Sequence, residues 1–238
     1  MKAALYSGSR NIYPDMITSA KSLAANSDVD RIYMLIEDND MGDVPDYVKC
    51  INVSGQLLFR KGTPNMKSGF TYFAMMRAAL ALLPELDELD RILSLDADTI
   101  VMQDVSDVWN LPINQKGNEC YFAATHEWHR TKNGLMYCNT GVALYNLEFL
   151  RKTGKAKEVI DCLNRRRYPW VEQDVFNYLC QGRIYDMPAE YNANDWTEWN
   201  LVKILHFAGK NDWRDEEAVV KWRNTSWEEV EKIRSKRC

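Results

Sequence analysis

The sequence lacks any apolar segment long enough to span a lipid bilayer, which argues against an integral membrane protein. It also shows no feature of an export signal, because the short apolar run after Met1 soon meets the polar residues 7–10. The six cysteines are widely spread and form no Cys-x-x-Cys element, so neither a disulfide framework nor a paired-thiol site is indicated. These absences predict a cytoplasmic protein with reduced thiols.

The chain lacks an excess of positive charge. Lys and Arg number 30 against 34 Asp and Glu, for a net charge of -4, which argues against a broad nucleic-acid-binding surface. A local basic cluster does occur near the C-terminus, close to Trp222 and Trp227. It consists of Lys232, Arg234, Lys236 and Arg237, and it leaves peripheral contact with a membrane open.

No internal repeat, low-complexity tract or linker rich in Pro, Gly or Ser divides the 238 residues, so a single α/β domain is expected. Apolar runs at 3–6 and 31–36 flank a helical pattern at 13–25, which is a βαβ unit and the start of a parallel sheet. Further strands are expected at 48–53, 91–95, 121–125, 138–145, 183–185 and 203–209. Further helices are expected at 72–83, 147–150, 156–163, 172–179 and in the charged tail 216–238.

Two aspartates interrupt the apolar stretch 91–101, at Asp96 and Asp98. Side chains alternate along an extended chain, so both carboxylates project to one side and Ala97 to the other. Two close carboxylates repel each other when ionised, and a divalent cation such as Mg²⁺ or Mn²⁺ removes that cost while binding substrate phosphates. The alternative is a turn at a strand end whose aspartates cap backbone amides.

Other polar groups have ordinary structural explanations when each is taken alone. Gly141 permits either a close approach of the backbone to a ligand or only a bulge. Acidic residues at 172–174 suit the positive end of a helix, and His206 at a strand end suits a core residue. Of the remaining segments, 126–129 is interpreted as a surface loop rather than a metal chelate. The aromatic and polar segment 191–199 is typical of loops that face carbohydrate.

The order of these motifs is more specific than any one of them. Leu-Asp-Ala-Asp at 95–98, Asn-Thr-Gly-Val at 139–142, Glu-Gln-Asp at 172–174 and His-Phe-Ala-Gly at 206–209 resemble the motifs of glycosyltransferase family 8. That family includes bacterial lipooligosaccharide galactosyltransferases and glycogenin. The resemblance extends from the first strand to about Trp213.

This resemblance implies an α/β fold of the GT-A type, a single Rossmann-like domain with a mixed, mostly parallel sheet flanked by helices. Residues 1–105 would form the nucleotide-sugar-binding half, 106–215 the donor-sugar and acceptor half, and 216–238 a helical tail. The implied activity is transfer of a hexose from a UDP-sugar, UDP-glucose or UDP-galactose, to a glycan or other hydroxyl acceptor. The anomeric configuration would be retained, and Mn²⁺ or Mg²⁺ would be bound.

The resemblance also implies roles for particular residues. The metal ligands would be Asp96, Asp98 and His206. The residues near the reacting carbon and the donor would be Glu172, Gln173, Asp174 and Arg77. The nucleotide sugar would further contact Ser7, Ser9, Asn11, Ala97, Asn139, Thr140, Gly141, Gly209 and Lys210.

The chain departs from the family's pattern at three places. Ser9-Arg10 stands where the family usually has acidic residues, and Glu172 replaces the commoner aspartate. The closing motif, His-x-x-Gly followed by Lys-Pro-Trp in the family, here ends Lys210-Asn-Asp-Trp213, so Lys210 is displaced. Two alternatives remain: a GT-A domain that binds nucleotide sugar or glycan without catalysis, and a haloacid-dehalogenase-type phosphotransferase. The latter fits poorly, because Ile100 stands where its signature has threonine or valine and the motif is mid-chain.

Overall fold

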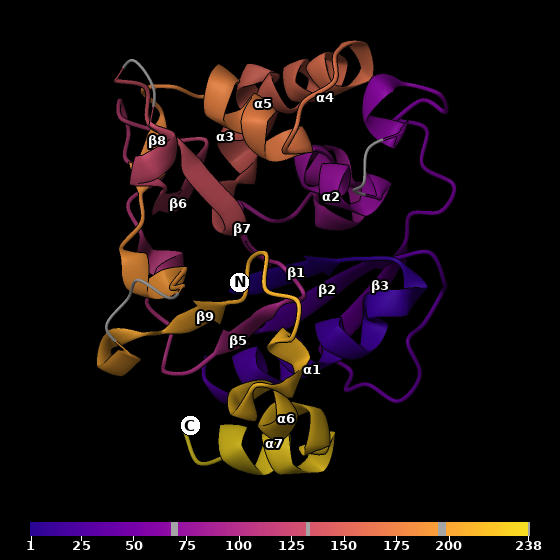
Figure 1. Cartoon of the computed structure of the whole chain (residues 1–238), viewed down its shortest axis with the longest axis vertical. Helices are drawn as coiled ribbons and strands as arrows, with labels where there is room; N and C mark the ends of the chain where they lie inside the picture. Colours follow the sequence, from indigo (N-terminus) through magenta and orange to yellow (C-terminus); the bar gives the residue numbers. More distant parts are fainter. Residues whose placement is uncertain (68–70, 132–133, 195–198, 238) are drawn as a thin grey trace.

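The computed structural model describes residues 1–67, 71–131, 134–194 and 199–237 and is built around a seven-stranded sheet. Its strands are β1 (Ala3–Ser7), β2 (Arg31–Ile36), β3 (Val48–Asn52), β4 (Arg91–Leu95), β6 (Phe122–His126), β7 (Cys138–Asn146) and β8 (Ile184–Asp186). They lie in the order β3-β2-β1-β4-β7-β6-β8 (Figure 1). β7 is antiparallel to β4 and β6, whereas the other neighbouring pairs are parallel. The expected mixed, mostly parallel sheet is confirmed, as is the opening βαβ unit.

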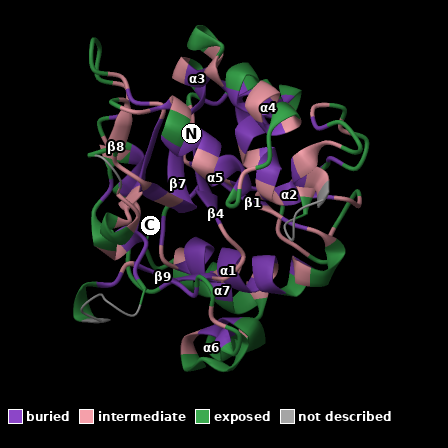
Figure 2. Cartoon of the chain, turned by 45° about the horizontal axis from the view of Figure 1, so that its top comes forward, coloured by how far each residue is buried: buried purple, intermediate pink, exposed green. Residues whose placement is uncertain are grey.

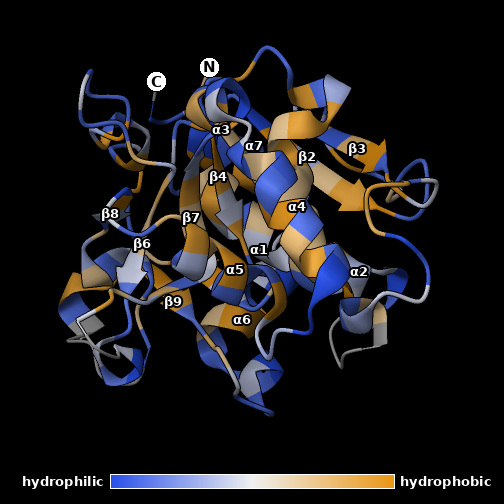
Figure 3. Cartoon of the chain, turned by 90° about the horizontal axis from the view of Figure 1, so that it is seen from above, coloured by the Kyte–Doolittle hydropathy of each residue, from blue (hydrophilic) through white to orange (hydrophobic). Residues whose placement is uncertain are grey.

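Alternating side chains of the strands build two hydrophobic clusters on opposite faces of the sheet. Along β1, Ala4 and Tyr6 belong to one cluster and Ala3 and Leu5 to the other, as the period of two in a strand requires. The strands at the centre of the sheet are buried (Figure 2). Hydrophobic residues concentrate on the strands, and hydrophilic residues on the peripheral loops (Figure 3).

Helices cover both faces of the sheet. On one side lie α2 (Tyr72–Met76), α3 (Leu147–Thr153), α4 (Lys155–Arg165) and α5 (Val171–Leu179), and on the other α1 (Tyr13–Ala25), α6 (Glu217–Asn224) and α7 (Trp227–Arg234) (Figure 1). Short 3-10 helices are η1 (Arg10–Ile12), η2 (Pro64–Lys67), η3 (Arg77–Leu82), η4 (Pro84–Leu86), η5 (Val108–Asn110), η6 (Trp128–Arg130), η7 (Ala189–Tyr191), η8 (Trp199–Leu201) and η9 (Trp213–Asp215).

A second, two-stranded sheet carries the end of the aspartate motif. β5 (Thr99–Val101) pairs antiparallel with β9 (Ile204–His206), and Thr99 lies opposite His206. The main chain is tied at the same point, because the Phe207 amide donates to the Asp98 carbonyl oxygen at 2.9 Å. This pairing brings the last strand of the chain beside the two aspartates.

The segment 72–83 differs from its expected form. Instead of one long helix it forms α2 up to Met76 and then the 3-10 helix η3 from Arg77. The tighter winding begins at a residue whose side chain is tied to other elements, so tertiary contacts override helix propensity here. The end is as expected, since Leu83 is extended before Pro84.

The C-terminal tail is helical, as expected, but its tryptophans are part of the fold. Trp222 is 5% exposed, and Trp227 packs edge-on against Tyr47 at 6.2 Å between ring centroids. Two of the basic residues are also used internally, since Arg234 donates to the Val29 carbonyl oxygen and Arg237 pairs with Asp104. The idea of a membrane contact through these tryptophans is therefore wrong for Trp222. Within the described residues, no helix has the length and apolarity needed to cross a bilayer.

Candidate active site

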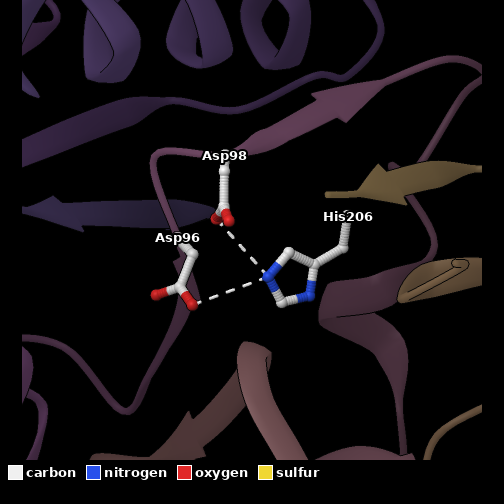
Figure 4. A group of neighbouring side chains, drawn as sticks. All are labelled: Asp96, Asp98 and His206. Atoms are coloured by element: carbon white, nitrogen blue, oxygen red, sulfur yellow. Dashed lines mark ion pairs between the residues drawn. The ribbon is translucent and has the colours of Figure 1, made fainter. Parts of the chain in front are cut away.

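The two aspartates and His206 form one cluster at the junction of the two sheets. Asp96 follows β4, Asp98 precedes β5, and His206 ends β9. His206 Nε2 lies 3.4 Å from an Asp98 oxygen and 3.7 Å from an Asp96 oxygen (Figure 4). One ligand atom from each residue lies within 4.8 Å of the other two. The three residues therefore lie together, and their assignment as metal ligands stays a prediction.

The ring of His206 is oriented by a neighbour outside the cluster. Its Nδ1 lies 2.7 Å from Asn192 Oδ1, and Asn192 in turn donates through Nδ2 to Asn139 Oδ1 at 3.1 Å. A carbonyl oxygen only accepts, so Nδ1 carries the proton and Nε2 faces the two carboxylates. This is the usual way in which a metal-binding histidine is fixed.

The ionisable groups of the cluster shift one another's pKa values. Burial and the neighbouring Asp98 raise the pKa of Asp96, although Arg77 opposes them. Burial alone would lower the pKa of His206, but contact with Asp98 and Asp96 raises it. The same contact lowers the pKa of Asp98 against the effect of its own burial. Two carboxylates and a neutral imidazole nitrogen fit a divalent cation, which would take the place of the proton.

Arg77 joins this cluster to helix α5. Its Nη1 donates to Asp96 at 2.7 Å and to the Thr140 carbonyl oxygen at 2.8 Å, and its Nη2 lies 2.5 Å from Glu172. Burial opposes its charge, but Asp96 and Glu172 together raise its pKa. Arg77 is therefore a buried link in the site, not the solvated surface charge that a lone helix arginine usually is.

Glu172 lies behind Arg77. Its side chain is 1% exposed, and neither carboxylate oxygen accepts a well-aligned hydrogen bond within the described residues despite the close ion pair. Burial raises its pKa to about 7, although Arg77 acts in the opposite direction. Val171, just before it, has a φ of 41°, which is strained for a β-branched residue. The chain bends there as it enters α5.

The other members of the Glu-Gln-Asp motif have different surroundings. Gln173 Oε1 accepts from the Thr140 amide at 2.9 Å. Asp174 turns away from the cluster, because one oxygen accepts from Tyr137 Oη at 2.6 Å and the other from the Trp170 amide at 2.9 Å. The structure thus links Glu172 to the cluster through Arg77, and places Gln173 against Thr140, while Asp174 contacts neither of these two residues.

Gly141 is needed because the cluster packs against its backbone. A β-carbon at this position would lie 2.1 Å from His206 Cε1 and 2.8 Å from an Asp96 oxygen. The pairing of β6 and β7 is also irregular here, between Ala124 and Thr125. The irregular pairing agrees with the bulge interpretation, and the close approach that the structure shows is by protein side chains. Approach of a ligand to Gly141 stays a prediction.

A cavity of about 350 Å³ lies beside Arg77, Asp96 and Asp98. It is also lined by Ser94, whose buried hydroxyl has no hydrogen-bond partner within the described residues. An orphaned hydroxyl facing a cavity with acidic and basic groups fits a polar ligand.

Of Ser7, Ser9 and Asn11, which are expected to contact the nucleotide sugar, only Ser7 is in the lining of this cavity. Ser7 lines it and donates to the Phe73 carbonyl oxygen at 2.9 Å. Ser9 instead donates to Asn11 at 2.5 Å on an exposed turn, next to the Arg10–Asp38 ion pair. Recognition by Ser9 and Asn11 stays a prediction.

A second cavity, of about 570 Å³, lies on the other side of His206. Asn139, Asn192 and the loop 126–129 contribute to it, and Trp128 in that loop is 76% exposed. The cluster therefore borders two cavities: Asp96 and Asp98 line the smaller one, and His206 lines the larger one together with amide and aromatic groups.

Comparison with known proteins identifies the fold and the family. Residues 19–215 match the sequence model of Glycosyl transferase family 8. The chain belongs to this family.

Curated relatives in the family are distant. General stress protein A of Bacillus subtilis is 24% identical over 164 residues, which are 64% of this chain and 57% of the relative. A relative from Haemophilus influenzae is 21% identical over 155 residues, 56% of this chain and 47% of its own length. The chain thus spans about half the length of the curated relatives that it matches.

Solved structures of glycosyltransferases share the fold. The galactosyltransferase LgtC, in complex with donor and acceptor sugar analogues, is 17% identical and gives a TM-score of 0.66 over 97% of this chain and 99% of LgtC. GlyE of Streptococcus pneumoniae is 20% identical, with a TM-score of 0.72 over 99% of this chain and 64% of GlyE. The GT-A fold is thereby confirmed.

Within this family 8 site, the sequence motifs did not reveal several residues. Asp15 and Arg214 line the smaller cavity, and Asn192 and Trp128 line the larger one. The sequence carries little signal for these residues, since Asp15 lies inside a regular helix and Trp128 lies in a loop that is interpreted as a surface loop. Lys210, which the closing motif favoured, has its amine 5.7 Å from the centre of the Phe207 ring, after Gly209 with a φ of 77°.

Proposed function

We propose that this chain transfers a hexose from a UDP-sugar, UDP-glucose or UDP-galactose, to a hydroxyl group of a glycan or similar acceptor. The observation that carries the proposal is the cluster of Asp96, Asp98 and His206 between two cavities. The nucleotide diphosphate would occupy the smaller cavity and the acceptor the larger one. The transferred sugar would lie between them, near Asn139 and Gly141.

The donor set fits a hard divalent cation that also accepts a nitrogen ligand. Mg²⁺ takes oxygen ligands, so the imidazole of His206 leads us to favour Mn²⁺. When bound, such an ion supplies positive charge to the departing diphosphate. The protein's own part is to hold the two carboxylates on the turn between β4 and β5, and to fix His206 through Asn192.

Arg77 and Glu172 support the reaction from behind the cluster. Glu172 is buried and paired with Arg77, and it lines neither of the two cavities described above. This supports retention through attack on the same face that the diphosphate leaves, rather than through a covalent bond to Glu172. The charge of Arg77 keeps Asp96 oriented and stabilises nearby negative charge.

The test is release of free UDP from UDP-glucose or UDP-galactose, with Mn²⁺ and with a chelator. We expect Mn²⁺-dependent release in the wild type and its loss in Asp98→Asn, since the amide keeps the shape but removes the charge that the cation needs. Asp104→Asn is the matched control, because Asp104 lies close in sequence and is 60% exposed in its ion pair with Arg237. UDP-sugar binding without release in the wild type would instead indicate the non-catalytic alternative.

A further inference from the structure

We propose that Arg214 is the residue of this chain that binds the donor's diphosphate, and that Asp15 holds it in position for that role. The proposal rests on the proposed function and assigns to Arg214 the part that the closing motif suggested for Lys210. It starts from the smaller cavity, whose lining includes Asp96, Asp98 and Arg214.

Arg214 is held from one side. Its Nε lies 3.1 Å from both Asp15 oxygens, and its Nη2 lies 2.6 Å from one of them. Asp15 is 6% exposed, whereas the Arg214 side chain is 49% exposed. The guanidinium is thus anchored through Nε and Nη2 on a buried carboxylate, whereas its Nη1 has no hydrogen-bond partner among the residues that the structure describes.

The backbone of Arg214 is fixed as well. Trp213 before it is 7% exposed and stacks on Phe207 at 5.8 Å between ring centroids. The Arg214 carbonyl oxygen accepts from Arg223 of α6 at 2.8 Å. The segment that follows β9 therefore presents the guanidinium from a packed position, which lowers the entropy lost when a ligand binds.

The other cations near the site are placed differently. Arg77 is committed to Asp96, Thr140 and Glu172, and its side chain is 11% exposed. Lys210 has its amine 5.7 Å from the centre of the Phe207 ring. The Arg214 guanidinium lies 4.7 Å from the centre of the Trp213 ring, and both Trp213 and Arg214 line the smaller cavity.

The chemistry suits a diphosphate. A planar guanidinium donates parallel hydrogen bonds to phosphate oxygens, and its charge persists at every physiological pH. Asp15 raises the pKa of Arg214, and Asp98 raises it to a smaller degree. The Arg214 guanidinium therefore interacts electrostatically with the aspartate motif. A diphosphate in the cavity would then meet the carboxylate-bound cation on one side and Arg214 on the other.

The experiment measures binding of UDP and of inorganic diphosphate by calorimetry in the presence of Mn²⁺. We expect Arg214→Gln to weaken both by about tenfold or more, the typical worth of a charged hydrogen bond. Mn²⁺ alone should bind as tightly as in the wild type or more tightly, because a positive charge near Asp98 is removed. Lys221→Gln is the matched control, because Lys221 is exposed on α6 and does not line the smaller cavity; it should change neither affinity by more than about twofold.

Removing Arg214 alone leaves Asp15 buried without its partner, which destabilises a fold. The double variant Asp15→Asn/Arg214→Gln removes both charges and should show the same loss of diphosphate affinity with a melting temperature closer to that of the wild type. Arg214→Lys should recover part of the affinity.

Unchanged UDP affinity in Arg214→Gln and in the double variant would overturn the assignment while leaving the proposed function intact. A parallel loss of Mn²⁺ affinity would also overturn it. If diphosphate binds through Arg214 but UDP does not bind, the assignment holds and the UDP-sugar donor is refuted. Failure of the wild type to bind either compound with Mn²⁺ would refute both.

Discussion

Gly141 makes room for His206 and Asp96, because it has no side chain. We expect Gly141→Ala to displace the His206 ring and to weaken Mn²⁺ binding by about tenfold or more, as changes beside metal ligands commonly do. Calorimetric titration of Mn²⁺ measures this directly.

The control for that change is Gly55→Ala. A β-carbon there meets nothing within 4 Å, and the backbone of Gly55 needs no positive φ. Equal Mn²⁺ affinity in Gly141→Ala and the wild type would show that the ring is not confined as described.

His206 gives the site a pH dependence with a defined sign. Imidazole binds a metal only when Nε2 is unprotonated, and its pKa in the folded protein is raised above the usual value by the two aspartates. Mn²⁺ affinity should therefore fall as the pH drops through that raised pKa, at a higher pH than for a free histidine at about 6.5.

The alternative is that the aspartates hold the ion without His206. Titrating Mn²⁺ at several pH values into the wild type and His206→Ala separates the two, since the variant should bind more weakly and lose the dependence above about pH 6. Identical curves for the two proteins would remove His206 from the site.

At the scale of elements, the Arg77–Glu172 contact joins η3, the start of α5 and, through Asp96, the β4–β5 turn. Burial raises the Glu172 pKa to about 7, above the 4.5 of an unperturbed glutamate. Between these values the folded state keeps a proton that the unfolded state has lost. Its contribution to stability is therefore present below pH 4.5 and is lost as the pH rises through about 7.

The Glu172→Gln variant has no ionisable group at this position. It should therefore not lose stability as the pH rises. We expect the unfolding free energy of Glu172→Gln, relative to the wild type, to rise by up to about 3 kcal/mol from about pH 4.5 to about pH 8. Urea unfolding in the absence of divalent cations measures it, and Glu148→Gln, at an exposed position of α3, is the control. A difference that stays constant across this range would contradict the burial of an ionisable carboxyl group.

At the scale of the whole molecule, the C-terminal helices complete the core on the α1 side of the sheet. Trp222 is almost fully buried there together with Val219 and Val230. Truncating a buried tryptophan costs about 3 to 5 kcal/mol, so Trp222→Ala should lower the unfolding free energy by about that amount. Chemical denaturation gives the value, with Val220→Ala on the exposed side of α6 as the control. A stability equal to that of the wild type would mean that the tail does not belong to the core.

The fold extends beyond the residues that match the family. The matched residues stop at 215, yet α6 and α7 cover the hydrophobic face that α1 presents.

The assignment of residues 1–105 and 106–215 to donor and acceptor halves stays a prediction, as does the cytoplasmic location. The segment 195–198, where Trp196 was expected to face carbohydrate, lies outside the described residues. Its neighbour Tyr191 is buried, and Asn192 serves His206.

The sequence by itself determined the elements and the identity of the motif residues. Alternation of apolar side chains is local, so β1, α1, β2 and the strand that leads to Asp96 follow from periods of two and of about 3.6 residues. The two aspartates could be identified from the sequence because they interrupt an otherwise apolar stretch. The family's motif order then located Glu172 and His206, although it placed Asp174 with them.

The tertiary structure decided which groups meet. Asp15 and Arg214 are 199 residues apart, and neither belongs to a local pattern that signals a site. Arg77 acquires its role only because the antiparallel pairing of β4 with β7 sets Thr140 and Gly141 beside Asp96. Such contacts depend on strand order and register, and these depend on how distant segments share one core rather than on any local stretch of sequence.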